Sequence, residues 1–204
     1  MNNNLFFPRL VRREENQYHS NRGNFYANYQ DNYPKIADDC FHRCVYCDAS
    51  EKECGGDPFS LDHFRPQQVF VNKFNGSLTN HPNNLYLSCQ KCNVLKSNDW
   101  KGCLDTVDGA TFIDKKGYID RFKHDFYDYM NIMDTGEIES TDDNGPGNYM
   151  INKMLLNRVN RVYIRKKRIF AKQCKDVNDM ITRKMDEVME KYNSGQFNND
   201  QLAH

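Results

Sequence analysis

Two cysteine pairs, Cys44-x2-Cys47 and Cys89-x2-Cys92, lie on either side of the dipeptide Asp62-His63. Residue Asn93 directly follows the second pair. Thiolates select zinc, whereas carboxylate and amide oxygens suit a harder divalent cation. A neutral imidazole is the natural base near pH 7. These residues therefore predict a structural zinc knot beside a second metal site where water could be activated.

Eight cysteines could also form disulfides. Close pairs with two intervening residues are better explained as metal ligands, because two thiolates on one tight turn supply half of a tetrahedron. Residues 48–88 separate the pairs, which is longer than the roughly 15 to 20 residues usual between such pairs. Closing the knot would therefore position whatever lies inside this insert.

Other assignments of these residues remain open. His42 could replace a cysteine as a zinc ligand, and Cys40 or Cys54 could complete the knot. An Asp beside a His is often only an exposed polar pair, and Asp62-His63 gains its interest from the flanking cysteines. Cys103 and Cys174 have no partner at ligand spacing, which suits free thiols or partly buried fillers.

Local patterns predict the elements that position these side chains. Residues 59–65 alternate apolar and polar and stop at Pro66, which favours a strand with Leu61 and His63 on one face and Asp62 on the other. A second short strand is expected over 84–88 and a helix over 90–98. Strand, strand, helix is thus the expected order around the metal.

Four regions are predicted. Residues 1–33 resemble an irregular arm, and 34–104 form the zinc-knotted core, opened by a short helix with Pro34 in its first turn. Residues 105–147 form an acidic, loop-rich connector with turns at Asp108-Gly109, Lys116-Gly117, Thr135-Gly136 and 145–147. Residues 148–204 are helical, with one or two long helices over 151–192, because apolar residues recur there at spacings of three and four.

Charge and hydropathy narrow the class of protein. The 28 basic and 28 acidic residues cancel, but residues 151–175 hold nine cations and no acid, whereas 120–143 hold eight acids and two cations. No apolar run reaches the roughly 18 residues of a membrane span, and Pro8 and Arg9 interrupt any signal-peptide pattern. A cytoplasmic protein without membrane partners is expected.

Four motifs in order, Cys44-Val-Tyr-Cys47, Leu61-Asp-His-Phe-Arg-Pro66, Asn84-Leu85 and Cys89-Gln-Lys-Cys-Asn-Val-Leu-Lys96, carry a family resemblance. Over residues 40 to 100 the chain resembles the zinc-knotted branch of the HNH endonuclease superfamily. The resemblance implies an α+β fold, a small ββα-metal core with a four-cysteine zinc knot flanked by irregular N-terminal and helical C-terminal regions. It also implies metal-dependent hydrolysis of DNA phosphodiester bonds.

The resemblance assigns the site residues. His63 is the general base, Asp62 and Asn93 hold Mg²⁺ or Mn²⁺, and Asn84 braces the loop between the strands, with Asn83 as its rival. Many relatives carry histidine at the position of Asn93, which leaves the preferred metal open. Zinc is structural, held by the residues Cys44, Cys47, Cys89 and Cys92.

Six cations are predicted to contact nucleic acid: Arg65, Lys96, Arg165, Lys166, Lys167 and Arg168. Binding a duplex usually requires several phosphate contacts, and the cationic stretch is the nearest plentiful source. Each prediction has an alternative. Arg65 could form a salt bridge, Lys96 could cap the helix, and the cationic stretch from Arg158 to Lys175 could be a solvated helix face.

Two other functional interpretations stay open. A zinc-binding module that holds nucleic acid or protein without cutting would explain the cysteines equally well, although it leaves Asp62, His63, Asn84 and Asn93 as coincidence. The segment Leu155-Leu156-Asn157-Arg158 also resembles HNH proteins of bacterial anti-phage defence, including Septu-type effectors. That looser resemblance implies a partner ATPase or another defence-system subunit.

Overall fold

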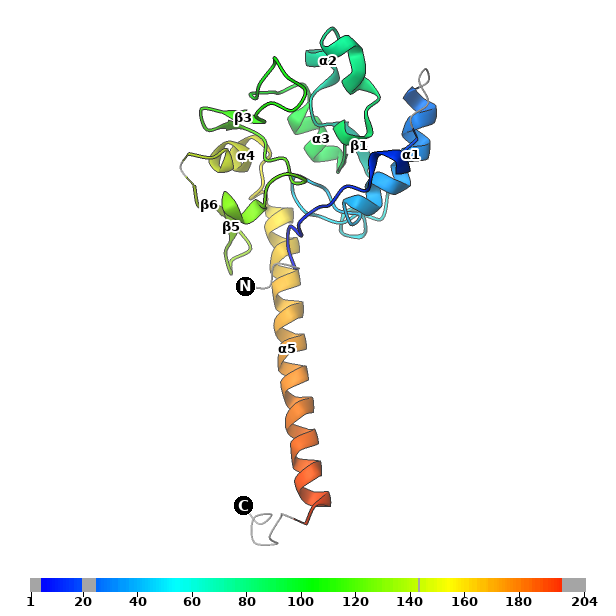
Figure 1. Cartoon of the computed structure of the whole chain (residues 1–204). Coiled ribbons are helices and arrows are strands. Elements are labelled where there is room, and N and C mark those ends of the chain that lie inside the picture. Colours follow the sequence, from blue (N-terminus) through cyan, green and yellow to red (C-terminus); the bar gives the residue numbers. More distant parts are fainter. Residues whose placement is uncertain (1–4, 20–24, 143, 196–204) are drawn as a thin grey trace. The chain divides into compact units, whose positions relative to one another are not determined.

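The computed structural model of the protein describes residues 5–19, 25–142 and 144–195. The chain divides into two compact units, Met1–Arg165 and Lys166–His204. Figure 1 labels the main elements. The α-helices are α1 (Phe25–Asp39), α2 (Gln67–Phe70), α3 (Gln90–Lys96), α4 (Gly147–Lys153) and α5 (Val159–Asn193). The strands are β1 (Ser60–His63), β2 (Leu85–Ser88), β3 (Phe112–Ile113), β4 (Lys116–Gly117), β5 (Met130–Ile132) and β6 (Ile138–Ser140).

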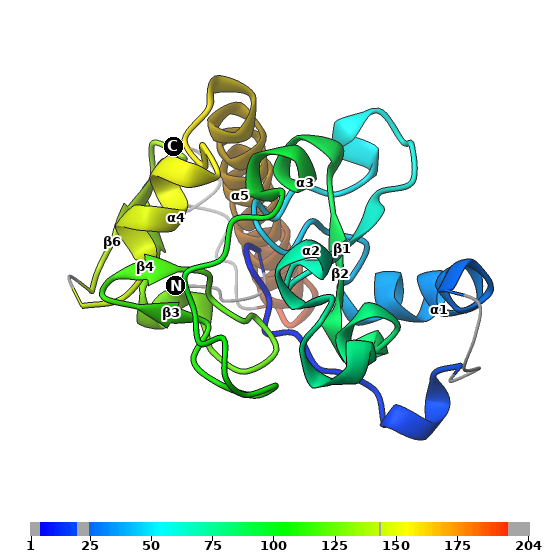
Figure 2. The same ribbon diagram turned by 90° about the horizontal axis from the view of Figure 1, so that it is seen from above.

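The predicted strand, strand, helix unit is confirmed. Strands β1 and β2 pair antiparallel, with Ser60 opposite Ser88 and His63 opposite Leu85. Helix α3 begins two residues after β2 and contacts β1, and Figure 2 shows it beside both strands. This is the α+β arrangement expected of a ββα-metal core.

Aromatic packing fixes the hairpin in the first unit. All four residues of β2 are buried. The rings of Phe64 and Tyr86 stack with centroids 4.5 Å apart, and Trp100 meets Phe64 edge-on at 5.7 Å. Such pairs add about 0.5–1.5 kcal/mol beyond the area they bury. The hairpin is therefore a rigid support for residues at its end.

The segment before the core differs in part from the irregular arm predicted over 1–33. Helix α1 begins at Phe25, so Pro34 lies inside the helix and not in its first turn as predicted. Proline removes a helix N–H and disfavours interior positions, which is why the pattern suggested a start there. Upstream, Arg12 donates to the carbonyl of Leu85 at 2.7 Å and lies 3.8 Å over the ring of Phe122. These contacts hold the residues before α1 against β2 and Phe122 within the first unit.

Two short hairpins lie in the acidic region predicted to be loop-rich. Strands β3 and β4 pair, and so do β5 and β6. Gly136 has φ +80° in the second hairpin, in agreement with the predicted turn. The turn predicted at Lys116-Gly117 is wrong, because these residues form β4 and the chain reverses at Asp114 and Lys115, whose φ angles are +49° and +65°. Positive φ at both positions matches the twist of paired strands.

Of the region predicted as one or two long helices over 151–192, residues 159–192 lie in the single long helix α5, and residues 151–153 are the end of the short helix α4. Between them Leu155 has φ +48°, and the Asn157 side chain bonds both the N–H and the carbonyl of Ile138. The second unit contains the rest of α5, whose residues from 173 onward are exposed. Among the described residues, none of the helices combines the length and apolar character needed to cross a bilayer.

Candidate active site and zinc knot

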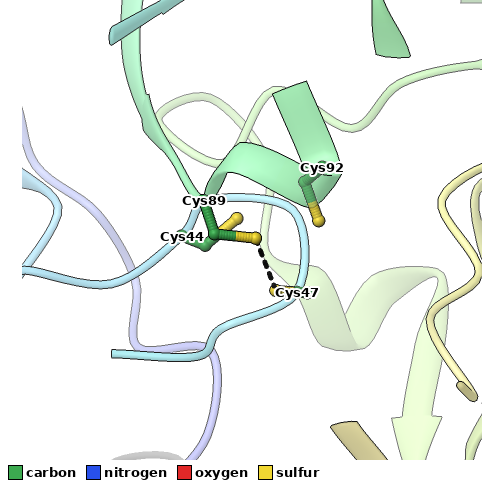
Figure 3. A group of neighbouring side chains, drawn as sticks. All are labelled: Cys44, Cys47, Cys89 and Cys92. Atoms are coloured by element: carbon green, nitrogen blue, oxygen red, sulfur yellow. Dashed lines mark hydrogen bonds between the residues drawn. The ribbon is translucent and has the colours of Figure 1, made fainter. Parts of the chain in front are cut away.

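The four predicted zinc ligands form one buried cluster. Their sulfurs lie within 4.8 Å of one another, and those of Cys47 and Cys89 are 3.8 Å apart (Figure 3). Tetrahedral zinc with Zn–S bonds of about 2.3 Å places its sulfurs about 3.8 Å apart. The cluster therefore fits a structural zinc ion held by the residues Cys44, Cys47, Cys89 and Cys92.

Backbone bonds join the two halves of the knot. The N–H of Val45 donates to the carbonyl of Leu87 at 3.0 Å, which ties the first cysteine turn to strand β2. Asp48 closes that turn with φ +60° and an N–H bond to the carbonyl of Cys44. Cys89 then caps α3, and Cys92 lies in its first turn. The knot thus sits where the strand ends and the helix begins.

The alternative ligands lie elsewhere. Within the described residues, the metal-capable group contains neither Cys40 nor Cys54. His42 is exposed, and its ring nitrogens lie 3.1 Å from carboxylate oxygens of Asp38 and Glu51. These positions leave the four-cysteine set as predicted.

Two arginines of the first unit contact the knot, which the sequence did not predict. Arg161 donates to the sulfurs of Cys47 at 3.2 Å and Cys89 at 3.4 Å. Arg158 donates to Cys92 at 3.5 Å. Although burial opposes the charge, the Cys47 thiolate raises the pKa of Arg161. Four thiolates around Zn²⁺ carry a net charge of −2, and a buried anion requires cations nearby. This charge requirement is the signal from which sequence reasoning could have expected arginines at the knot.

Three predicted catalytic residues line one cavity of about 250 Å³. Asp62 and His63 reach it from the end of β1, and Asn93 reaches it from α3. The alternation over 59–65 predicted Asp62 and His63 on opposite faces unless the strand twists or bulges, and in the structure both residues line this cavity at the end of β1. Residues of the three types expected at the site, an aspartate, a histidine and an asparagine, thus line one opening.

His63 is held in one tautomer. Its Nε2–H donates to the carbonyl of Thr79 at 2.9 Å, and a carbonyl can only accept. In the neutral ring Nδ1 therefore carries the lone pair. Burial lowers the pKa of His63, and the charge of Lys96 acts in the same direction. The lowered pKa favours the uncharged imidazole near pH 7.

Asn84 braces the loop, as predicted for it. Its Oδ1 accepts the N–H of Arg65 at 2.8 Å, and its Nδ2 donates to the carbonyls of Arg65 and Leu78 at 3.0 and 2.9 Å. Leu78 precedes Thr79, which binds the His63 ring. Asn84 is buried whereas Asn83 is exposed, so Asn84 is the asparagine that is bonded to the loop segment next to Thr79.

Asp62 belongs to a buried polar network. Its carboxylate accepts the Tyr46 hydroxyl at 2.5 Å and lies 3.0 Å from the Lys96 ammonium. Lys96 also donates to the carbonyl of His63 at 2.7 Å. Lys96 is fully buried with both partners inside the protein, which favours a structural role over the predicted contact with a phosphate. Its role is to hold the Asp62-His63 dipeptide in position.

Replacing Lys96 with methionine is expected to destabilise the first unit by about 3–5 kcal/mol, because it leaves the Asp62 carboxylate buried without its cation. Urea unfolding followed by circular dichroism measures the change. Lys91, exposed on the same helix, provides the control, and Lys91→Met should change stability by less than about 0.5 kcal/mol. Equal stabilities of the two variants would contradict a structural role for the pair.

The other side chains predicted to contact phosphate differ in how deeply they are buried. Arg65 is 5% exposed, donates to the carbonyl of Gly109 at 2.7 Å and lies 4.8 Å over the Trp100 ring. Arg165 is 1% exposed and donates to the carbonyl of Leu156 at 2.9 Å. Both guanidiniums thus have partners within the protein, and this burial does not support their predicted contact with nucleic acid. Lys166 and Lys167 are exposed and Arg168 is half-buried.

The comparisons with known proteins bear on this part of the chain. Residues 44–99 match the family model described as HNH endonuclease. The matched HNH segment contains both cysteine pairs, both strands of the hairpin and α3. Together with the four-cysteine cluster it supports the HNH superfamily and a nuclease in general. No curated protein and no solved structure matches the chain significantly.

Proposed function

We propose that the protein is a metal-dependent endonuclease that hydrolyses phosphodiester bonds of DNA. The observation that carries the proposal is the shared cavity of Asp62, His63 and Asn93 beside the four-cysteine cluster, with the His63 ring held through Nε2. The HNH match gives independent support. His63 is the proposed general base, and Asp62 and Asn93 are the proposed ligands of Mg²⁺ or Mn²⁺.

His63 would act through Nδ1. This nitrogen takes a proton from a water molecule, whose oxygen attacks phosphorus while the bond to the 3′-oxygen breaks. Thr79 keeps the ring oriented by accepting from Nε2, and the positive charge formed on the ring is partly balanced by the nearby Asp62 carboxylate. Asn84 and Lys96 are positioning residues in this scheme.

The residues present fit a hard divalent cation. A carboxylate offers about four acceptor positions, and Tyr46 and Lys96 use only part of the capacity of Asp62. Asn93 offers an amide oxygen at the same cavity. When bound, the ion neutralises the phosphate and stabilises the leaving oxygen.

Supercoiled plasmid incubated with purified protein tests the activity. Open-circular or linear product is expected with Mg²⁺ or Mn²⁺, and no product is expected after addition of excess EDTA. Zinc content is measured in the same samples, because a chelator that also empties the knot would stop cutting by unfolding. Product formed without any added divalent ion would contradict the proposed second metal.

Removal of the proposed metal ligands should change the dependence on the divalent ion. In Asp62→Asn and Asn93→Ala the half-saturating Mg²⁺ concentration should rise at least about tenfold, which corresponds to about 1.4 kcal/mol. Titration of the cleavage rate with Mg²⁺ measures this. Gln90→Ala, at an exposed position of α3 outside the cavity, should titrate like the parent. If the two variants and the parent give the same Mg²⁺ titration curve, Asp62 and Asn93 are not ligands of the metal.

The pH profile should report the lowered pKa of His63. His63 can accept a proton only when its ring is neutral, which is the case above its pKa. Because this pKa is lowered, the cleavage rate should be maintained at pH 7. The rate should fall only when the pH drops below the ordinary histidine value of 6.5. Single-turnover cleavage at saturating Mg²⁺ gives the profile. A rate that already falls between pH 8 and pH 7 would contradict a buried neutral imidazole.

A non-catalytic zinc-binding module is the second candidate. It is favoured by the engagement of Asp62, whose carboxylate already has Tyr46 and Lys96 as partners. On this interpretation the buried pair is structural, and the module holds nucleic acid or protein. It predicts no cleavage products under any metal condition, and DNA binding only if nucleic acid is what the module holds.

Two further parts of the proposal concern partners. The exposed cations Lys166 and Lys167 remain proposed phosphate contacts, since their side chains are open to solvent. A role as the nuclease of an anti-phage defence system, beside a partner ATPase, rests on the resemblance of Leu155–Arg158. Leu156 is buried and Arg158 contacts Cys92, so two residues of that segment also have structural roles.

A further inference from the structure

The helix of the second unit carries an unpaired apolar stripe. Its side chains are Phe170, Cys174, Val177, Ile181, Met185, Val188 and Tyr192. The six larger ones are 50–66% exposed, and Cys174 is exposed as well. Met180 and Met189 widen the stripe and are also more than half exposed.

The spacing of the stripe has a period of eleven residues. Phe170, Ile181 and Tyr192 are eleven apart, as are Cys174 and Met185, and Val177 and Val188. Eleven residues over three turns correspond to 3.67 residues per turn, close to the 3.6 of a straight helix. The stripe therefore stays on one face through the length of the helix, as the seam of a helix pair requires.

A helix of this kind is not expected to persist alone in water. Most helical stability in proteins comes from packing an apolar face, not from propensity. Contiguous exposed apolar patches on soluble proteins usually mark interaction sites. The face must therefore be covered by a partner helix with a matching apolar seam.

The stripe is symmetric about Ile181, and this symmetry identifies a partner. The steps between successive members are four, three, four, four, three and four residues, which read the same in both directions. An antiparallel second copy centred on Ile181 would set Phe170 against Tyr192, Cys174 against Val188, and Val177 against Met185. We propose that this helix pairs with the same helix of a second copy of the chain, antiparallel and centred on Ile181.

The charge distribution favours the antiparallel direction. Residues 166–175 hold five cations and no acid, whereas 176–193 hold five acids and three cations. A parallel pair would bring ten cations together at one end. The antiparallel pair places each cationic segment beside 187–195, which contains Glu187 and Glu190 against Lys191. Opposite net charges at each end favour this direction.

The mass of the full-length protein in solution tests the pairing. The parent should sediment at twice the 24.1 kDa chain mass. Ile181→Glu should sediment as a monomer, because each carboxylate would meet its own copy at the centre. The matched control is Arg183→Glu, which lies about 200° around the helix from Ile181 and should stay dimeric. Unchanged zinc content shows that the first unit is intact in both variants. A monomeric parent, or a dimeric Ile181→Glu, would overturn the proposal.

Disulfide cross-linking tests whether the two helices run antiparallel. The variant used for it introduces no charge into the apolar stripe. In the antiparallel register Val188 lies beside Cys174 of the second copy, whereas the two copies of Cys174 are about 21 Å apart along the axis. Mild oxidation with oxidised glutathione should therefore link Val188→Cys into a covalent dimer through Cys174. The parent should not link, and adding Cys174→Ser should abolish the link. A parent that links through Cys174 would show a parallel pair and overturn the proposed direction.

Discussion

Replacing Cys89 with serine is expected to remove zinc from the protein and to unfold its nuclease core. Structural zinc sites contribute on the order of 10 kcal/mol to folding, and whole domains are stable by only about 5–15 kcal/mol. The knot closes the insert between Cys47 and Cys89, so its loss frees both strands and α3 together. Elemental analysis and circular dichroism measure zinc and fold on the same sample.

The chain provides a matched control for this change. Cys103 lies outside the cluster, and its sulfur accepts the N–H of Asp105 at 3.4 Å and lies 3.8 Å from the Thr106 hydroxyl. Cys103→Ser should keep one zinc per chain and the parent spectrum. A Cys89→Ser protein that remains folded without zinc would show that the core does not depend on the knot.

Replacing His63 with alanine is expected to lower the cleavage rate by about 10²–10⁴-fold, the usual contribution of general-base catalysis. Zinc content and fold should be unchanged, because the side chain is half-buried and its bond to Thr79 contributes only about 1 kcal/mol. Single-turnover cleavage of plasmid, with zinc analysis of each preparation, separates loss of chemistry from loss of structure.

His42→Ala is the control for the His63 experiment. His42 is exposed and pairs with Asp38 and Glu51 away from the proposed active-site cavity. It should cut like the parent. If His63→Ala cuts at the parental rate, His63 is not the base, and the non-catalytic zinc module becomes the better account once contaminating nuclease is excluded.

The local part of the site could be predicted from sequence. The ligand pairs, the Asp-His dipeptide and the two short strands lie within about 50 residues, and each pattern has a direct structural meaning. Asn84 could be placed as a brace because the resemblance supplied its role, and the bonds to Arg65 and Leu78 agree with it. Spacing was sufficient for the zinc ligands, because each cysteine pair is adjacent in sequence, whereas the roles of His63, Asp62, Asn84 and Asn93 came from the resemblance.

The fate of the cations could not be predicted in the same way. Arg65, Lys96 and Arg165 are buried, and Arg158 and Arg161 lie on sulfurs far away in sequence. A cation has the same appearance in sequence whether it meets solvent, a phosphate or a buried anion. Only tertiary packing decides among these, because the desolvation of the charge is offset by partners from distant elements.

The arginines on the knot have a consequence for the time course of synthesis. Arg158 follows Cys92 by 66 residues. At a ribosomal rate of about 5–20 residues per second, all four sulfurs emerge roughly 3–13 s before that guanidinium. During this interval the knot can take up metal from the side that the first turn of α5 later covers. Metal loading during translation can thus precede the contact, whereas in a refolding full-length chain both arginines are already present when the metal binds.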